Sequence, residues 1–149
     1  MKRAIGSTFE MSLRILLMLG ETARKSLTLD KIMAFDFITV YANDFNLAKS
    51  NLHGYSSYRF GEFAGRRELV QKGIKELVLS GRVIVSCKED GFEYAINNNG
   101  LDLTGGIECE YADAYRVQVA EVLHSLGNKS ETDLLEMISQ KTIQLLKEV

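Results

Sequence analysis

Proline is absent from the 149-residue sequence, although a chain of this length would ordinarily contain several. This absence excludes stiff, extended linkers and favours mostly helical structure. Long apolar runs are also lacking, since no stretch approaches the roughly 20 residues of a membrane span. We therefore expect a cytoplasmic protein that does not cross a membrane.

Cysteine and histidine are scarce. The two cysteines, Cys87 and Cys109, are 22 positions apart and form no CxxC pair, so we expect two reduced thiols rather than a metal site. The two histidines, His53 and His124, belong to no HExxH motif. A GxSxG motif and a phosphate-binding glycine loop are also missing. These absences predict a protein that is not an enzyme and needs no cofactor.

Positive charge is not in excess. The chain has 18 basic and 20 acidic residues, for a net charge of -2, whereas a freestanding nucleic-acid binder usually has a clear basic excess. Residues 1–97 carry 14 Lys and Arg against 11 Asp and Glu, and residues 98–149 carry 4 against 9. The sequence is therefore a mildly basic part followed by an acidic part.

Hydrophobic periodicity predicts helices in the first half of the chain. A capping box, Ser7-x-x-Glu10, opens the first of them. The predicted helices cover about residues 7–19, a second segment that begins at Thr28 or Asp30 and ends near 43, and residues 60–79. Alternating apolar residues on both sides of the turn pair Asp90-Gly91 then predict a β-hairpin. Three helices followed by a hairpin is the order of a winged helix-turn-helix, with the third helix as recognition helix and the hairpin as wing.

The polar, glycine-containing segment 97–106 is the expected boundary between two parts. We predict a winged-helix domain over residues 1–97, with a long loop at 43–59, and an acidic helical extension over residues 98–149. In the extension we expect one helix over about residues 107–126, with Tyr115 in its apolar stripe, and a last helix capped by Ser130. A loop of this length is often functional, although a tolerated surface insertion fits equally well. The first two helices are apolar on most faces, so the extension either covers them or docks on a partner.

The run LHGYSSYRFGEFAGRRELVQKGIKELVLSGRV, residues 52–83, resembles the middle component of bacterial ABC-three-component systems. These systems include the accessory subunit of Lamassu-type anti-phage defence. Gly54 and Ser57 stand where the family pattern has prolines. The elements that match, in the family's order, are Leu52-His53, Tyr58-Arg59, Gly61-Glu62, Arg66-Arg67, Leu69-Val70 and Arg82-Val83.

The resemblance implies a non-catalytic adaptor that bridges an SMC- or Rad50-like ABC ATPase and a separate effector, often a nuclease, and that meets DNA only through this complex. The alternative is a winged-helix DNA-binding transcriptional regulator. Two acid–base pairs at four-residue spacing, Glu62–Arg66 and Glu68–Lys72, neutralise much of the positive charge of the third helix. A helix that reads DNA usually presents unpaired polar and basic side chains, so the adaptor is favoured.

The candidate partner surface combines one face of the third helix with the 43–59 loop. Arg66 and Lys72 represent the helix face, and His53, Tyr58 and Arg59 represent the loop. Tyrosine and arginine are enriched at interface hot spots. The alternative is that Tyr58 and Arg59 merely cap the third helix.

One arginine falls within an apolar stripe. At about 100° per residue, Arg67 lies between Phe63 and Val70 on the third helix, and Asp36 lies within the apolar arc of the second. A buried arginine without an acid would be very unfavourable. We therefore predict a buried ion pair between Asp36 and Arg67 that fixes the register of the two helices, in preference to a direct role in ligand binding.

Overall fold

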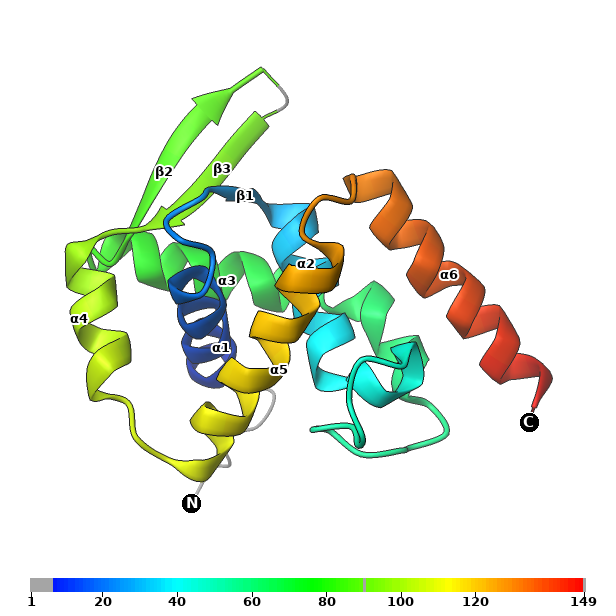
Figure 1. Cartoon of the computed structure of the whole chain (residues 1–149). Helices are drawn as coiled ribbons and strands as arrows, with labels where there is room; N and C mark the ends of the chain where they lie inside the picture. Colours follow the sequence, from blue (N-terminus) through cyan, green and yellow to red (C-terminus); the bar gives the residue numbers. More distant parts are fainter. Residues whose placement is uncertain (1–6, 90, 149) are drawn as a thin grey trace.

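The fold is mostly helical with one small antiparallel sheet (Figure 1). The computed structural model describes residues 7–89 and 91–148, so Asp90 of the predicted turn lies outside the described residues. The α-helices are α1 (Thr8–Gly20), α2 (Leu29–Val40), α3 (Arg67–Leu79), α4 (Asn98–Gly106), α5 (Glu110–Leu126) and α6 (Glu131–Lys147). The remaining elements are the 3-10 helices η1 (Ala42–Phe45) and η2 (Arg59–Gly65) and the strands β1 (Leu27–Thr28), β2 (Val83–Lys88) and β3 (Gly91–Ile96).

Side-chain caps determine where three of the helices begin. The Ser7 hydroxyl accepts a hydrogen bond from a backbone N–H in the first turn of α1, and Thr28 and Ser130 do the same for α2 and α6. Such caps pair N–H groups that have no partner within the helix. The helix starts predicted at these residues are therefore confirmed.

The sheet has the strand order β1-β3-β2. β2 and β3 form the predicted hairpin, in a register that pairs Val83 with Ile96 and Val85 with Tyr94. β1 adds only two residues to the other edge of β3. A strand of two residues is too short to show alternation, which is why the sequence did not reveal it.

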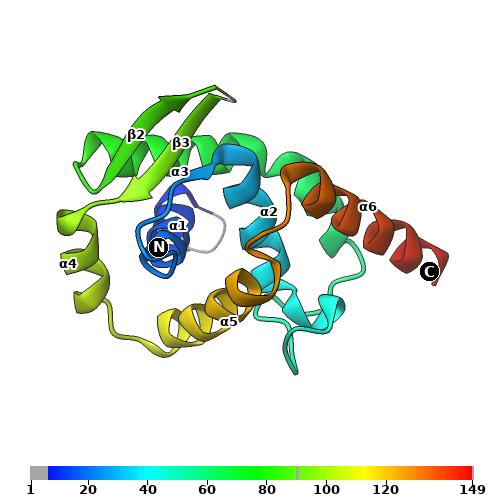
Figure 2. The same ribbon diagram turned by 45° about the horizontal axis from the view of Figure 1, so that its top comes forward.

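One buried cluster contains side chains from both halves of the chain. α1 and α2 are buried on nearly all sides, and α5 packs across both of them (Figure 2). α3 approaches α1 closely at Gly73, where an added Cβ would lie 3.2 Å from Ile15 and 3.3 Å from Met11. The apolar faces of α1 and α2 are therefore covered by α3, α5 and α6 within the chain itself.

The segment 97–106, predicted as a polar boundary, contains helix α4. The Asn97 side chain accepts a hydrogen bond from the backbone N–H of Gly100 at 2.9 Å and so caps this helix. The division of the chain at residue 97 stays a prediction. Within the part of the chain that the structure describes, no helix is both long and apolar enough to span a bilayer.

Candidate functional site

Asp36, fully buried in the middle of α2, accepts hydrogen bonds from three side chains. Arg14 on α1 donates two of them, from Nε to Oδ1 at 2.8 Å and from Nη2 to Oδ2 at 2.9 Å. Arg66, the residue before α3, donates from Nη1 to Oδ2 at 2.9 Å. The hydroxyl of Tyr115 on α5 donates to Oδ1 at 2.7 Å. α1, α2, the start of α3 and α5 therefore meet at one carboxylate.

Each of the two arginines also contacts a glutamate one helical turn away. Arg14 donates to Glu10, and Arg66 lies 3.3 Å from a carboxylate oxygen of Glu62. Glu62 in turn accepts a hydrogen bond from the hydroxyl of Tyr41 at 2.8 Å. The charges thus extend from the buried carboxylate toward the surface, because Glu62 is about half exposed.

The network holds Asp36 in its charged form. Burial alone would raise the pKa of this carboxyl, but the guanidinium groups of Arg14 and Arg66 and the hydrogen bonds hold it well below its usual range. Burial and the neighbouring carboxylate raise the pKa of Tyr115 well above its ordinary value, so its hydroxyl remains a donor. With both oxygens of Asp36 occupied, the cluster is suited to fixing helices rather than to transferring protons.

The predicted pair between Asp36 and Arg67 is wrong. The arginine that reaches Asp36 is Arg66, one position earlier. Arg67 instead pairs with Asp30 in the first turn of α2, and half of its side chain is exposed. The burial of an acid in the apolar arc of α2 is correct, and only its partners differ.

The reason for this error is a change of helix type. The prediction assumed one α-helix running from Phe63 through Val70, but residues 59–65 form the 3-10 helix η2 and α3 begins only at Arg67. A 3-10 helix advances about 120° per residue, compared with about 100° in an α-helix. A stripe projected across that junction is therefore rotated, which moves the buried position from Arg67 to Arg66.

Sequence reasoning missed two members of the network, Arg14 and Tyr115. A signal for the first existed, because α1 is apolar on nearly every side and a single arginine within it requires a buried acid. Tyr115 lies in a correctly predicted apolar stripe of α5, but a buried tyrosine hydroxyl also requires a partner. That partner is more than 70 positions away, at a distance that no local pattern reveals.

A cavity of about 930 Å³ adjoins the network. Its lining includes Arg14, Arg66, Tyr41, His53 and Tyr111. His53 Nε2 lies 2.7 Å from the Tyr111 hydroxyl, so the 43–59 loop and α5 meet in the lining of the cavity. Burial, followed by the nearby charge of Arg14, lowers the pKa of His53 below 6.5.

The 43–59 loop is held together by its own polar side chains. The side-chain oxygen of buried Asn51 accepts hydrogen bonds from the backbone N–H groups of Asn43 and Asp44, and its amide donates to Asp44. Arg59 donates to both oxygens of Asp44, at 2.7 and 2.9 Å. The loop is thus packed, and the charge of Arg59 is paired with that of Asp44 within the loop.

The structure places the five candidate partner-binding residues in different environments. Tyr58 is 82% exposed. Lys72 is exposed and pairs with Glu68 on the same helix at 3.3 Å. His53 lines the cavity, Arg59 is held by the loop, and Arg66 is buried in the network. The structure therefore does not bring the five together on one surface.

Metal-ligating side chains do not gather within residues 7–89 and 91–148. No three or more His, Cys, Asp or Glu side chains in these ranges are placed to hold a metal ion. Cys87 and Cys109 are both free thiols at the surface.

We predict that Asp36→Asn lowers the free energy of unfolding by about 3–5 kcal/mol, because two buried guanidinium groups lose their shared counter-charge. The matched control is Asp30→Asn on the same helix, where a partly exposed pair and one first-turn charge are lost. It should cost about 1 kcal/mol or less. Urea denaturation measures both values, and equal losses for the two variants would contradict a special role for Asp36.

We also predict that His53 makes stability depend on pH. As the pH falls, His53 is protonated in the unfolded chain before it is protonated in the folded chain, because its pKa is lower in the folded chain. The contribution of neutral His53 to the free energy of unfolding is therefore complete above pH 6.5 and is lost as the pH falls from there toward the folded pKa. Between about pH 7.5 and 5.5, wild type should therefore lose more unfolding free energy than His53→Gln. The control is His124→Gln, at an exposed position on α5, which should follow wild type. The same pH dependence in His53→Gln and wild type would refute this.

Comparison with known proteins identifies the family of the chain. Searches of curated proteins and of solved structures found no match. The family model for Middle Component 2 of ABC-three component (ABC-3C) systems matches residues 4–148. This range includes the buried network, the 43–59 loop and all of the helices described above. The chain therefore belongs to the family of ABC-three component system Middle Component 2 proteins.

Proposed function

We propose that this protein is a non-catalytic adaptor that bridges an SMC- or Rad50-like ABC ATPase and an effector of the nuclease type in a Lamassu-like anti-phage defence complex. The observation that carries this proposal is the family match over residues 4–148. A middle component of a three-component system works beside other components, so its surface should be built for protein partners. DNA would be reached through the assembled complex.

The proposal includes a winged-helix arrangement for the first part of the chain. Its support is the element order α1–β1–α2–α3–β2–β3 together with the strand order β1-β3-β2. In this arrangement α3 takes the place of a recognition helix, and the β2–β3 hairpin takes that of the wing. Because unrelated functions share such folds, the surface rather than the fold has to decide between protein and DNA.

Two separate exposed apolar regions support a bridging role. The first lies where α3 meets the hairpin and includes Leu79 and Phe92, which are 76% and 60% exposed. The second lies between the 43–59 loop and the end of α6, where Tyr58 and Leu146 line a cavity of about 410 Å³. The hairpin and the end of α6 lie far apart in both ribbon views (Figures 1 and 2). Two distant apolar regions suit a subunit with two partners.

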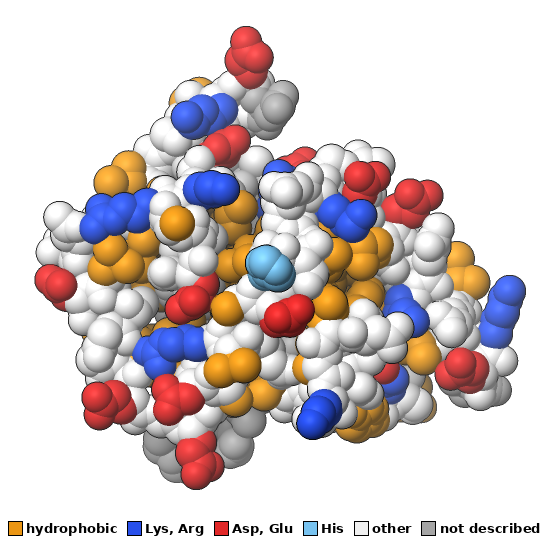
Figure 3. Space-filling model, in the orientation of Figure 1, with side chains coloured by type: hydrophobic (Ala, Val, Ile, Leu, Met, Phe, Trp, Pro, Cys, Tyr) orange, Lys and Arg blue, Asp and Glu red, His pale blue; other side chains and the backbone are white. Residues whose placement is uncertain are grey.

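The charges of the surface give less support to a DNA-binding regulator. On α3, Arg67 is paired with Asp30 and Lys72 with Glu68, which leaves little free positive charge. Figure 3 shows acidic and basic side chains interspersed over the face seen there, with apolar side chains between them. A DNA-binding face is expected to concentrate positive charge instead.

We predict that Tyr58→Asp removes one partner from the complex. Wild type, co-expressed with the products of its neighbouring genes, should copurify with an ABC ATPase and a second protein. Tyr58→Asp should reduce recovery of one of them by about tenfold or more, because a charge replaces an exposed aromatic anchor. Its circular dichroism and melting temperature should not change, since the side chain is 82% exposed.

The matched control is Val117→Asp, which introduces the same charge at a 71% exposed position on α5 and should keep both partners. Full recovery of both partners with Tyr58→Asp would remove this residue from the interface. Wild type that recovers neither protein but binds DNA in moderate salt would instead favour the regulator.

A further inference from the structure

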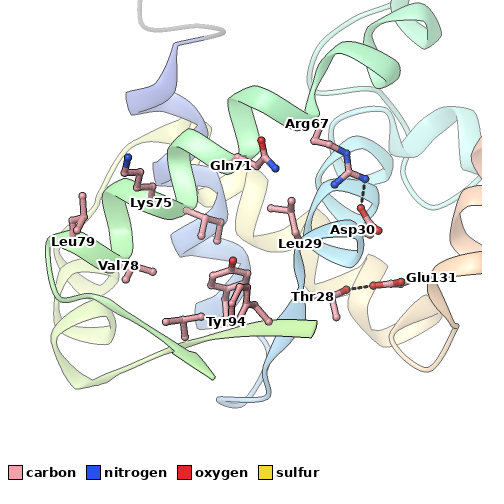
Figure 4. A pocket seen from close by; sticks show the side chains of 13 residues that line it. Thr28, Leu29, Asp30, Arg67, Gln71, Lys75, Val78, Leu79, Tyr94 and Glu131 are labelled. Atoms are coloured by element: carbon pink, nitrogen blue, oxygen red, sulfur yellow. Dashed lines mark hydrogen bonds and ion pairs between the residues drawn. The ribbon is translucent and has the colours of Figure 1, made fainter. Parts of the chain in front are cut away.

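A groove of about 670 Å³ runs between α3 and the hairpin (Figure 4). One side is formed by α3 and the other by the hairpin, and Leu29 at the start of α2 contributes to the lining. Figure 4 shows Val78 of α3 and Tyr94 of the hairpin on opposite sides of this space. The volume lies within the range of about 300–1,000 Å³ that is usual for binding pockets.

The hairpin side of the groove is apolar because of its register. Val85 pairs with Tyr94, and side chains two positions apart along a strand point to the same face. The same face therefore carries Val83, which is buried in the core, and farther out Val85 and Phe92, which are exposed. The hairpin thus extends an apolar face beyond the core that covers its base, and Leu79 continues this apolar surface at the end of α3.

The α3 side of the groove carries polar and basic groups at one-turn intervals. Arg67, Gln71 and Lys75 are four residues apart and follow one another along the helix (Figure 4). The charge of Arg67 is matched by Asp30 within the groove. Among residues 7–89 and 91–148, Lys75 has no ion-pair partner and the Gln71 side chain has no hydrogen bond. A positive charge and an amide that have no partner among the described residues therefore border an apolar wall.

We propose that this groove binds an amphipathic helix of a protein partner, with apolar side chains against the hairpin and a carboxylate facing Lys75. This inference rests on the proposed adaptor function and assigns a surface to one of its two partners. A helix that binds in a groove presents anchors at i, i+3 or i+4, and i+7, which form one apolar stripe with a polar border. The groove has the complementary pattern, an apolar wall beside a basic edge.

The charge distribution also sets which end of the groove the partner's carboxylate occupies. Asp30, its partner Arg67 and Glu131 line one end of the groove, and Lys75 and Leu79 line the other (Figure 4). The first end keeps a net negative charge, because Arg67 balances only one of its two carboxylates. An acidic side chain of the partner is attracted to the Lys75 end and repelled from the other. A nucleic-acid backbone gains little from this surface, because Val85 and Phe92 offer phosphates no hydrogen-bond donor.

Two groove variants test the proposal in the co-expressed complex. Leu79→Asp places a charge on the apolar surface, and Lys75→Glu reverses the charge that faces the partner's carboxylate. Each should lower recovery of the same partner by about tenfold or more while recovery of the other is unchanged. Val117→Asp, at a 71% exposed position on α5, should keep both partners. Both groove variants should retain the wild-type melting temperature, because both side chains are exposed.

The two native cysteines provide a second readout that needs no substitution. Cys87 lies opposite Phe92 in the hairpin and therefore beside the groove, whereas Cys109 is at the start of α5. Both thiols are exposed. In the assembled complex, maleimide should label Cys87 about tenfold more slowly than in the isolated chain, because a bound helix shields it. Cys109 should react at its original rate.

The proposal is overturned if the complex assembles, both groove variants keep both partners, and Cys87 reacts as in the free chain; the adaptor function would then survive without this surface. Wild type that captures neither partner contradicts the adaptor function and this inference together. A chain that dimerises alone and becomes monomeric in Leu79→Asp would assign the groove to a second copy instead. Loss of DNA binding in Lys75→Glu, with no effect of Leu79→Asp, would assign it to nucleic acid.

Discussion

The carboxylate of Asp36 joins α1, α2, α5 and the start of α3. A charge in this position would be strongly unfavourable alone, and so would either of the arginines that bind it. Together, Arg14, Arg66 and Tyr115 supply donors to both of its oxygens. Such a cluster need not stabilise the chain more than apolar packing would, but it permits only one register of the helices that contribute to it.

This register matters because both proposed partner surfaces are attached to the helices that the cluster fixes. Arg66 immediately precedes α3, whose outer face forms the groove with the hairpin. Through Glu62 and Tyr41 the same network reaches the 43–59 loop, because the Tyr41 ring meets the His53 ring edge-on. His53 in turn contacts Tyr111 of α5. For the proposed adaptor, this core cluster of charged groups would hold the two partner surfaces in a fixed relation.

The sequence was informative where local rules act and uninformative where distant contacts decide. The starts of α1, α2 and α6 could be predicted because each depends on a cap within a few residues. The burial of Asp36 could be predicted from its place in an apolar arc. The partners of Asp36 could not be predicted in the same way. The 3-10 helix η2 moves the arginine that faces Asp36 from position 67 to position 66. Tyr115 comes from the part of the chain that the sequence predicts as a separate extension.

Native-state hydrogen exchange in Tyr115→Phe, which lacks only the hydroxyl that joins α5 to Asp36, tests this role of the carboxylate most directly. If the carboxylate unites the helices, the core amides of α2 and α5 in wild type should open with one common free energy. Loss of the hydroxyl should then lower both by the same amount, about 1–3 kcal/mol. Faster exchange confined to α5, with α2 unchanged, would show that the two halves of the chain open independently and would contradict the account.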